Sequence, residues 1–554
     1  VYHMARVNRK DQAKKLIAAA LANTKLEPHV RQVTAARCYV LLEEPQSAEK
    51  HYLDAVKLQQ DDAALRLLVA RFYATQKQRP KSRPHLAKVL DPKSTATSAQ
   101  RGVARYLDVL AVAAGGTYAD RLRAFAMLEK PETSGITDLY TRLILLLQSP
   151  LKRDRLAAID VLERLQKLRP LTPGARFRLA RLYEKHDRWA DAKKIVEELL
   201  KKNPRSTLLL GWYAVEIISN EGKSPKALAR SRKLVNLLKG VQLNGLPTAM
   251  AEAQLLTAQG KSADAAKLMN AAVDALVNNR KKLPAADSAQ LALAAQTCES
   301  LNLLAAAERI ETLKAGLAEK PESRLTLAQF LARRGRYADA LKVCDEAARK
   351  GANPLAVSLV ASSVVSAGRP TTADFATAER LIKNALQATR KDKPKTDTIL
   401  VNYAGLLMAA RRLAEAEQIY RQLLPEYPRN IQVLNNLAWL LAHRNHKLDE
   451  ALLLIGRAVE RSGPVHPFLD TRGVIRLQKG NVTQATADFQ QAVEELPDPS
   501  YSLHLAQAHL AEGNRPAAVA AMKQAFQQGL SLDTLHPLEH PGYHQAVKAT
   551  GVKE

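Results

Sequence analysis

A recurrence of about 34 residues constrains this chain more than any other feature of its sequence. It is clearest in four consecutive segments, residues 397–430, 431–463, 466–498 and 499–528. Each segment has Ala or Gly at an early position, an Ala about twelve positions later and a larger apolar residue four positions after that. In the first segment these are Ala404, Ala416 and Tyr420. A period of this length predicts stacked helical hairpins, because one hairpin cannot bury its apolar face alone.

The small residues of the repeat have a packing role. Two antiparallel helices approach to roughly 8–10 Å, and the closest approach requires small side chains where the helices cross. Ala416 and Ala485 are therefore expected at helix contacts, with the larger residue one turn later filling the space where the helices diverge.

These residues resemble the tetratricopeptide repeat (TPR). The best single copy is residues 173–204, which have Leu179, Ala180, Tyr183, Trp189 and Ala192 in the family's positions. The run 435–441, followed by residues 470–473, is similar to repeats common in bacterial TPR proteins. The resemblance extends over nearly the whole chain. It implies an all-α fold, a right-handed superhelical solenoid of about fourteen stacked TPR-like hairpins.

The repeats match the 34-residue pattern to different degrees along the chain. We expect degenerate N-terminal TPR-like repeats in residues 1–170, central repeats in 171–396, regular repeats in 397–528 and a C-terminal cap in 529–554, since solenoid ends need capping. Ala13 and Ile17 have the positions of a second helix, so the first repeat is expected to be truncated. A signal, an anchor or a further domain would then precede Val1. The compartment stays open, and the bacterial cell envelope or periplasm is favoured over the cytoplasm by resemblance alone.

Composition excludes several classes of protein. No apolar run approaches the roughly 18–20 residues that a membrane helix needs. The three cysteines, Cys38, Cys298 and Cys344, form no C-x-x-C pair and are expected to be small buried side chains.

A charged connector is expected at residues 391–395, and about five extra residues lengthen the hairpin turn at 368–374.

No constellation of residues predicts catalysis. The sequence has no phosphate-binding loop, no H-E-x-x-H pair and no G-x-S-x-G elbow. His536, His540 and His544 are spaced four apart, but Pro537 and Pro541 interrupt the helix that would align them. They are interpreted as polar capping residues, and no catalytic residue, metal or cofactor is predicted. His443 and His446 are expected in a solvated turn.

The resemblance implies that the first helix of each hairpin lines a concave face, which holds an extended peptide or a partner helix. Arg and Gln there can hydrogen-bond to a partner backbone or carboxylate, and a Trp can supply an aromatic anchor. The alternative is a solvated groove, with the Trp used in packing. The residues in the inward position are Arg37, Arg71, Arg181, Gln254, Gln296, Gln329, Trp439 and Gln507.

The net charge of +28 is unevenly distributed. Residues 1–250 contain 46 Lys and Arg against 24 Asp and Glu, whereas residues 251–554 contain 37 against 31. A basic half attracts acidic proteins, nucleic acid, anionic polymers or lipid headgroups, and the alternative is charge that only increases solubility.

The main hypothesis is a non-catalytic scaffold for protein–protein interaction, in a bacterial envelope or polymer-export assembly by resemblance. One alternative is an anion- or nucleic-acid-binding module that uses the basic half. Nucleic acid is disfavoured, because aromatic stacking residues are scarce. The other alternative is the regulatory arm of an enzyme whose catalytic domain precedes residue 1.

Overall fold

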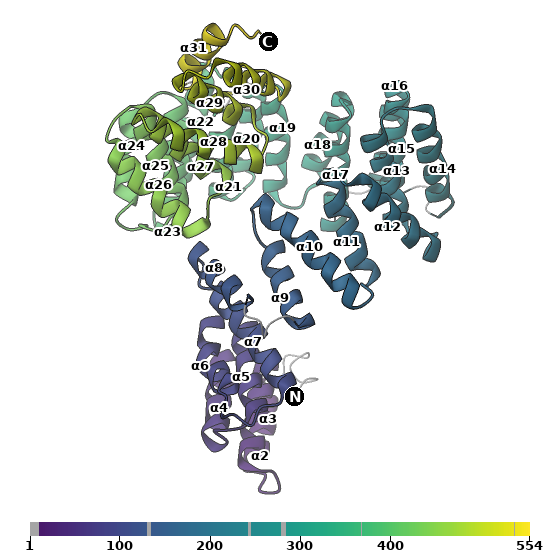
Figure 1. Ribbon diagram of the computed structural model, residues 1–554, viewed down its shortest axis with the longest axis vertical. Helices are drawn as coiled ribbons and strands as arrows, with labels where there is room; N and C mark the ends of the chain where they lie inside the picture. Colours follow the sequence, from purple (N-terminus) through teal and green to yellow (C-terminus); the bar gives the residue numbers. More distant parts are fainter. Residues whose placement is uncertain are drawn as a thin grey trace. The chain divides into compact units, whose positions relative to one another are not determined.

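The computed structural model consists of helices joined by short turns (Figure 1). It describes residues 10–129, 135–241, 245–278, 284–366, 368–536 and 538–553. No β-strand element occurs in these ranges. The all-α prediction is therefore confirmed. The expectations that concern Val1 and Pro537 lie outside the described residues.

The chain divides into two compact units. The first comprises Val1–Pro170 with the short piece Glu460–Gly463, and the second comprises Leu171–Val459 with Pro464–Glu554. The helices of the first unit are α2 (Lys10–Ala22), α3 (Pro28–Leu41), α4 (Pro45–Leu58), α5 (Ala63–Thr75), the 3-10 helix η1 (Arg79–Ser82), α6 (Arg83–Leu90), α7 (Ser98–Ala113), α8 (Tyr118–Met127), α9 (Ile136–Leu147) and α10 (Lys152–Leu168).

The second unit contains the best repeats. Its elements are α11 (Pro173–Glu184), α12 (Trp189–Lys202), α13 (Thr207–Glu221), α14 (Pro225–Val241), α15 (Leu246–Ala258), α16 (Ser262–Val277), α17 (Ala285–Ser300), α18 (Leu304–Leu317), η3 (Pro321–Arg324), α19 (Leu325–Arg333), α20 (Tyr337–Arg349), α21 (Pro354–Val364), α22 (Thr372–Thr389), α23 (Lys393–Ala409), α24 (Leu413–Leu423), α25 (Ile431–His443), α26 (Leu448–Ser462), α27 (His466–Gln478), α28 (Val482–Glu495), α29 (Pro499–Ala511), α30 (Arg515–Gln527) and α31 (His540–Thr550).

Consecutive helices pack as hairpins, from α3 with α4 to α29 with α30. The first helix of a hairpin also contacts the first helix of the next one, as α19 contacts α21, α21 contacts α23 and α25 contacts α27. This is the stacking that the 34-residue recurrence predicts. The number of about fourteen hairpins, like the four-part division of the chain, stays a prediction.

The small residues of the repeat lie in the core. Ala404, Ala416 and Ala485 are fully buried, as are Cys298 and Cys344, whereas Cys38 is only half-buried. The helices α27 and α28 approach closely at Gly473 of α27, where an added Cβ would lie 2.5 Å from a ring atom of Phe489 in α28. Two large apolar clusters run through the second unit, one between Leu246 and Leu406 and one from Val401 to Ala546.

Local sequence signals explain where the helices begin. Asn430 caps α25 by accepting hydrogen bonds from the backbone N–H groups of Gln432 and Val433. A proline occupies the first turn of α21, α27 and α29, where its missing N–H has no helical partner to lose. The expected connector at 391–395 is shorter than predicted. Asp392 caps α23, and this helix begins at Lys393.

Candidate binding surface

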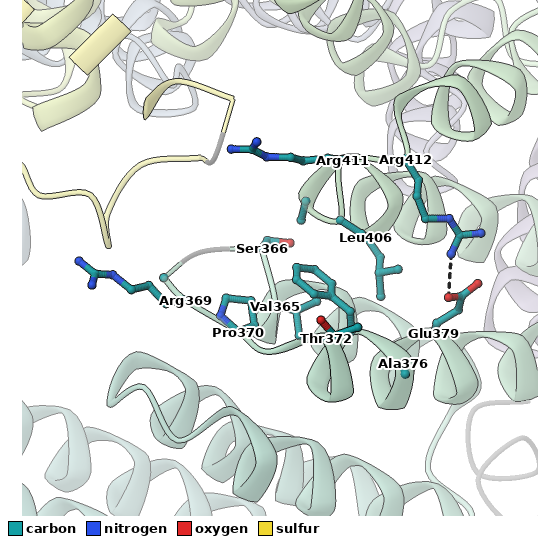
Figure 2. Close-up of a pocket in the computed structure, with 14 residues that line it drawn as sticks. Val365, Ser366, Arg369, Pro370, Thr372, Ala376, Glu379, Leu406, Arg411 and Arg412 are labelled. Atoms are coloured by element: carbon teal, nitrogen blue, oxygen red, sulfur yellow. Dashed lines mark hydrogen bonds and ion pairs between the residues drawn. The ribbon is translucent and has the colours of Figure 1, made fainter. Parts of the chain in front are cut away.

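Two pockets in the second unit lie beside the turn that joins α21 to α22. The larger has a volume of about 1150 Å³, and its walls come from α19, α21, their turns and the segment that precedes α31. Gln329, Arg334, Ser363, Arg369 and Asp533 are among its lining residues. The smaller has a volume of about 480 Å³ and lies between the same turn, α22 and the end of α23 (Figure 2).

The turn between α21 and α22 is held by a capping box and a close contact. Thr371 and Asp374 cap each other's backbone N–H groups at the start of α22. Gly368 has a φ of 76°, and a Cβ at this position would lie 1.9 Å from the hydroxyl oxygen of Tyr337. Only glycine fits there. The backbone N–H of the next residue, Arg369, donates to the same hydroxyl over 3.2 Å, so Tyr337 fixes the start of the arginine side chain.

The smaller pocket has an apolar floor and a cationic edge. Val365 and Leu406 are buried apolar side chains of the floor. Figure 2 shows Arg369 and Arg411 extending to one side of this pocket, while Arg412 turns the other way. Arg412 donates to Glu379 over 2.8 Å.

Arg412 is therefore bound within the repeat stack. It bridges Glu379 of the preceding hairpin and Glu415 of its own. Burial opposes ionisation of Glu379, but hydrogen bonds from Lys383, Tyr403 and Arg412 outweigh burial and lower the pKa of this carboxyl to about 2. The positive charge that Arg412 adds to the pocket is thus offset by neighbouring carboxylates.

Arg411 has an uncommon backbone conformation. Its φ is 59°, in the left-handed region. Positive φ recurs in the hairpin turns, at glycines such as Gly335 and Gly480 and at other residues such as Glu43, Lys77 and Asn302. A side chain in this conformation costs of the order of 1–2 kcal/mol relative to the right-handed region.

Residues 530–536 and 538–539, between α30 and α31, contact the α21–α22 turn and the first helices α25 and α29. The turn at Asp533 is held on both sides, because Leu530 and Leu535 are both buried. Between them Ser531 and Thr534 form a tight turn, in which the Thr534 hydroxyl donates to the Ser531 carbonyl over 2.8 Å. Asp533 lies at the exposed tip of this turn and forms an ion pair with Arg369.

The same segment covers a cluster of aromatic and titratable side chains. Trp439 of α25 stacks on His443, with ring centroids 3.6 Å apart, and His536 meets the Trp439 ring edge-on at 4.8 Å. Burial lowers the pKa of His443 and of His536 to about 4 in each case. The expected solvated turn at His443 is thus wrong, because this residue ends α25 and packs on Trp439.

An ionic triad joins the last two repeats to the C-terminal segment. His504 of α29 donates from Nδ1 to Asp470 of α27 over 2.7 Å, and its Nε2 lies 3.5 Å from Glu539. Burial opposes protonation of His504, but the two carboxylates outweigh it and raise its pKa to about 10. Burial also opposes ionisation of Glu539, whereas His504 lowers the pKa of that carboxyl to about 2. The triad therefore holds a histidinium between two carboxyl groups.

The eight predicted site residues are divided between the units. Arg37 on α3 and Arg71 on α5 are exposed in the first unit. In the second unit Arg181 and Gln296 are exposed, and Gln254 donates to the Ser219 hydroxyl over 3.5 Å. Arg181 faces Glu216, whose pKa is raised to about 7 by burial and by Glu184, against the opposing charge of Arg181.

Three of the predicted residues lie near the C-terminal segment or the larger pocket. Gln329 lines the larger pocket, together with Asp533 and Thr534. Trp439 packs between His443 and His536, as described above. Gln507 of α29 faces α31, where a Cβ on Gly542 would lie 2.6 Å from its Nε2.

Arg369, Arg411 and Asp533 were not identified from the sequence. The lengthened turn at 368–374 was the available signal for Arg369. The position of Asp533 depends on a contact 164 residues apart along the chain, which repeat phasing does not predict.

The described part of the chain contains no group of three or more His, Cys, Asp or Glu side chains arranged to hold a metal ion. None of its helices has both the length and the apolar character needed to cross a membrane.

Comparison with known proteins agrees with the repeat pattern. Sequence models of the tetratricopeptide repeat match residues 152–207, 299–354, 372–440 and 471–529. These matches lie on the hairpins α10–α12, α18–α20, α22–α25 and α27–α30. The chain therefore carries tetratricopeptide repeats in these segments.

Individual relatives match less of the chain. The TPR repeat-containing protein PA4667 of Pseudomonas aeruginosa is 29% identical over 121 residues, which is 22% of this chain and 20% of that protein. The chain thus matches about a fifth of the length of this relative. A thermophilic TPR protein from Thermus thermophilus has 18% identity and a TM-score of 0.29, and the match covers 36% of this chain and 98% of that one. The APC/C hetero-tetramer Cut9–Hcn1 has 12% identity and a TM-score of 0.30, with 89% and 98% covered.

Proposed function

We propose that this chain is a non-catalytic scaffold whose first helices in the second unit bind an extended segment of a protein partner. TPR repeats support a role in protein interaction. The observation that carries the finer proposal is the larger pocket. It lies against the adjacent first helices α19 and α21, and the predicted binding residue Gln329 forms part of its wall.

The chemistry of this wall suits a peptide. Gln329 can donate to and accept from a partner backbone, and Arg334 and Arg369 present guanidinium groups to carbonyls or carboxylates. At the C-terminal end the inner side chains are already engaged, since Trp439 packs on His536 and His504 pairs with Glu539. We therefore place the partner segment along α19, α21 and α23, and assign Trp439 and Gln507 to holding the C-terminal segment.

A library of displayed 12-residue peptides, selected against the whole protein, tests this proposal. Enriched peptides should lose binding when the pocket is filled by Gln329→Trp. The matched control is Lys342→Trp on α20, the second helix of the same hairpin, where Lys342 is also exposed. Peptides that bind both variants equally, or that lose binding only with Lys342→Trp, would contradict the inner-surface proposal.

The charge asymmetry favours a second candidate, an anion-binding role for the basic half. All three inward arginines, Arg37, Arg71 and Arg181, lie within residues 1–250. Attraction by a dedicated basic site should weaken as salt shortens the screening length to about 8 Å near physiological ionic strength. Reversing all three to Glu in the whole protein should then reduce heparin binding and flatten its salt dependence. Unchanged heparin binding would indicate charge that only increases solubility.

The setting of the scaffold is proposed from resemblance alone. The run 435–441 is similar to repeats of bacterial TPR proteins, which favours an envelope or polymer-export assembly. Fractionation of the native host, followed by immunoblotting, tests this placement. Recovery of all the protein with the cytoplasmic fraction would contradict it.

A further inference from the structure

The structure places the carboxylate of Asp533 at the edge of the larger pocket. Asp533 pairs with Arg369, and both residues line the larger pocket. We propose that Arg369 and Arg411 form a carboxylate-binding site for an acidic segment of a partner protein, in which the partner's carboxylate replaces that of Asp533. This inference rests on the proposed scaffold function and names the chemistry of the partner segment.

The exposure of the Asp533–Arg369 pair favours replacement of the Asp533 carboxylate by that of a partner. The Arg369 side chain is 74% exposed and that of Asp533 is 59% exposed, so water screens the pair and it contributes little to stability. The backbone on either side of Asp533 is held by buried Leu530 and Leu535. A rotation of the Asp533 side chain is therefore sufficient to release Arg369, and the fold around it stays intact.

The neighbouring triad differs in this respect. Glu539 and His504 lie in a buried contact, and Tyr543 of α31 belongs to the apolar core. Displacing that part of the segment would uncover charged groups that burial has already desolvated, which is costly. Exchange is thus confined to the tip of the turn at Asp533.

The smaller pocket adds a requirement to the partner. Its floor is apolar, with Val365, Phe375 and Leu406, and Arg369 belongs to its lining as well as to that of the larger pocket. Arg411 extends to the same side as Arg369 (Figure 2). An aliphatic or aromatic side chain fits the floor, and Asp or Glu residues on either side of it then reach Arg369 and Arg411, one guanidinium group each. The site therefore favours a segment in which an apolar residue stands next to an acidic one.

The backbone at Arg411 provides an unusual test. Because its φ is 59°, glycine suits this position better than arginine does. Arg411→Gly should remove the guanidinium group and leave the melting temperature unchanged or raised. Reduced binding by this variant could not be attributed to damage of the fold.

The probe is the fluorescein-labelled peptide Gly-Ser-Leu-Asp-Leu-Asp-Gly-Ser, measured by fluorescence anisotropy against the whole protein. Its control is the same peptide with Asn in place of both Asp residues. Arg369→Gln should weaken binding of the acidic peptide by about tenfold or more, as expected for a lost charge-assisted hydrogen bond. Asp533→Asn should tighten it by up to about fivefold, because the competing exposed pair is worth about 1 kcal/mol or less.

Arg349→Gln on α20 is the matched protein control. The Arg349 side chain is 71% exposed and pairs with Asp345, so the variant removes an equally exposed, paired arginine outside the pockets. It should change affinity by less than about twofold, since only weak long-range attraction is lost.

Three results would overturn the proposal: equal effects of Arg369→Gln and Arg349→Gln, equal affinity for the acidic and amide peptides, or tighter binding of the oligonucleotide dT12 than of the acidic peptide. The last result would indicate a nucleic-acid site. If library peptides lose binding with Gln329→Trp but not with Arg369→Gln, the carboxylate site alone is refuted and the scaffold proposal stands.

Discussion

Replacing Gly473 by alanine tests whether α27 and α28 pack as closely as the small residues of the repeat require. The added Cβ would lie 2.5 Å from Cε1 and 2.8 Å from Cδ1 and Cζ of Phe489. Real Cβ atoms do not approach so closely, and the Phe489 ring is fully buried and packs on the ring of His504 at 5.5 Å. The helices α27 and α28 must therefore separate or the ring must leave its rotamer. Overpacking of this kind costs about 1–3 kcal/mol.

Helix propensity acts in the opposite direction. Alanine is favoured over glycine by about 1 kcal/mol inside a helix. Gly456→Ala in α26 isolates this gain, because a Cβ at Gly456 would meet nothing within 4 Å. The difference in unfolding free energy between the two variants should therefore equal the overpacking cost, with Gly456→Ala the more stable by about 1–3 kcal/mol.

Hydrogen exchange measured by mass spectrometry suits this comparison, since it reports local unfolding free energies without assuming that the chain unfolds in one step. Amides of α27 and α28 should exchange faster in Gly473→Ala, whereas those of α26 should exchange more slowly in Gly456→Ala. Adding Phe489→Leu to Gly473→Ala should cost less than the sum of the single changes, because the two positions share one contact. Equal stabilisation by both glycine replacements would refute the close approach of α27 and α28.

Two further predictions concern stability. Ala416→Leu and Ala485→Leu should each lower the urea midpoint by an amount equivalent to about 1–3 kcal/mol, since both alanines are fully buried, and unchanged midpoints would mean that the repeat phase is wrong. The melting temperature should be highest near pH 6–7. It should fall towards acid pH because His443 and His536, whose pKa values are lowered to about 4, become protonated more readily in the unfolded chain. It should fall towards alkaline pH because His504, whose pKa is raised to about 10, loses its proton. His536→Gln should reduce the acid-side slope and His504→Gln the alkaline one, and profiles identical to the wild type would contradict these assignments.

The hairpins were predictable from the sequence because their signals are local and repeated. Ala404, Ala416 and Tyr420 mark one hairpin, and the same spacing recurs in the next three. Their burial in the structure follows from helix geometry, since residues three and four apart share a face. The start of α23 was misplaced by three residues because the cap at Asp392 was not recognised within a charged run.

The pocket edge could not be predicted in the same way. Residues 530–539 follow the last repeat and carry no periodic signal, yet Asp533 pairs with Arg369 and Glu539 with His504. Such contacts depend on where a non-repeating segment crosses the stack. The family's inward position pointed to Gln329, which lines the larger pocket, but it could not show that Trp439 packs against His536.

The electrostatic arrangement explains why the basic composition does not by itself locate a site. Many arginines are paired along the stack, as Arg421 with Glu450 of the next hairpin and Arg333 with Glu299 of the preceding one. These pairs occupy guanidinium groups between neighbouring repeats. An arginine can bind a partner only where the partner's carboxylate can replace the one it already pairs with. We propose that Arg369, whose exposed partner is Asp533, meets this condition.

The most direct measurement of the central claim is a hydrogen-exchange footprint of the whole protein with and without a selected binding peptide. Our account predicts slower exchange in the first helices α19, α21 and α23 and in the turn at residues 365–371, with no change in the second helices α20, α22 and α24. Protection confined to those second helices would contradict the inner-surface account.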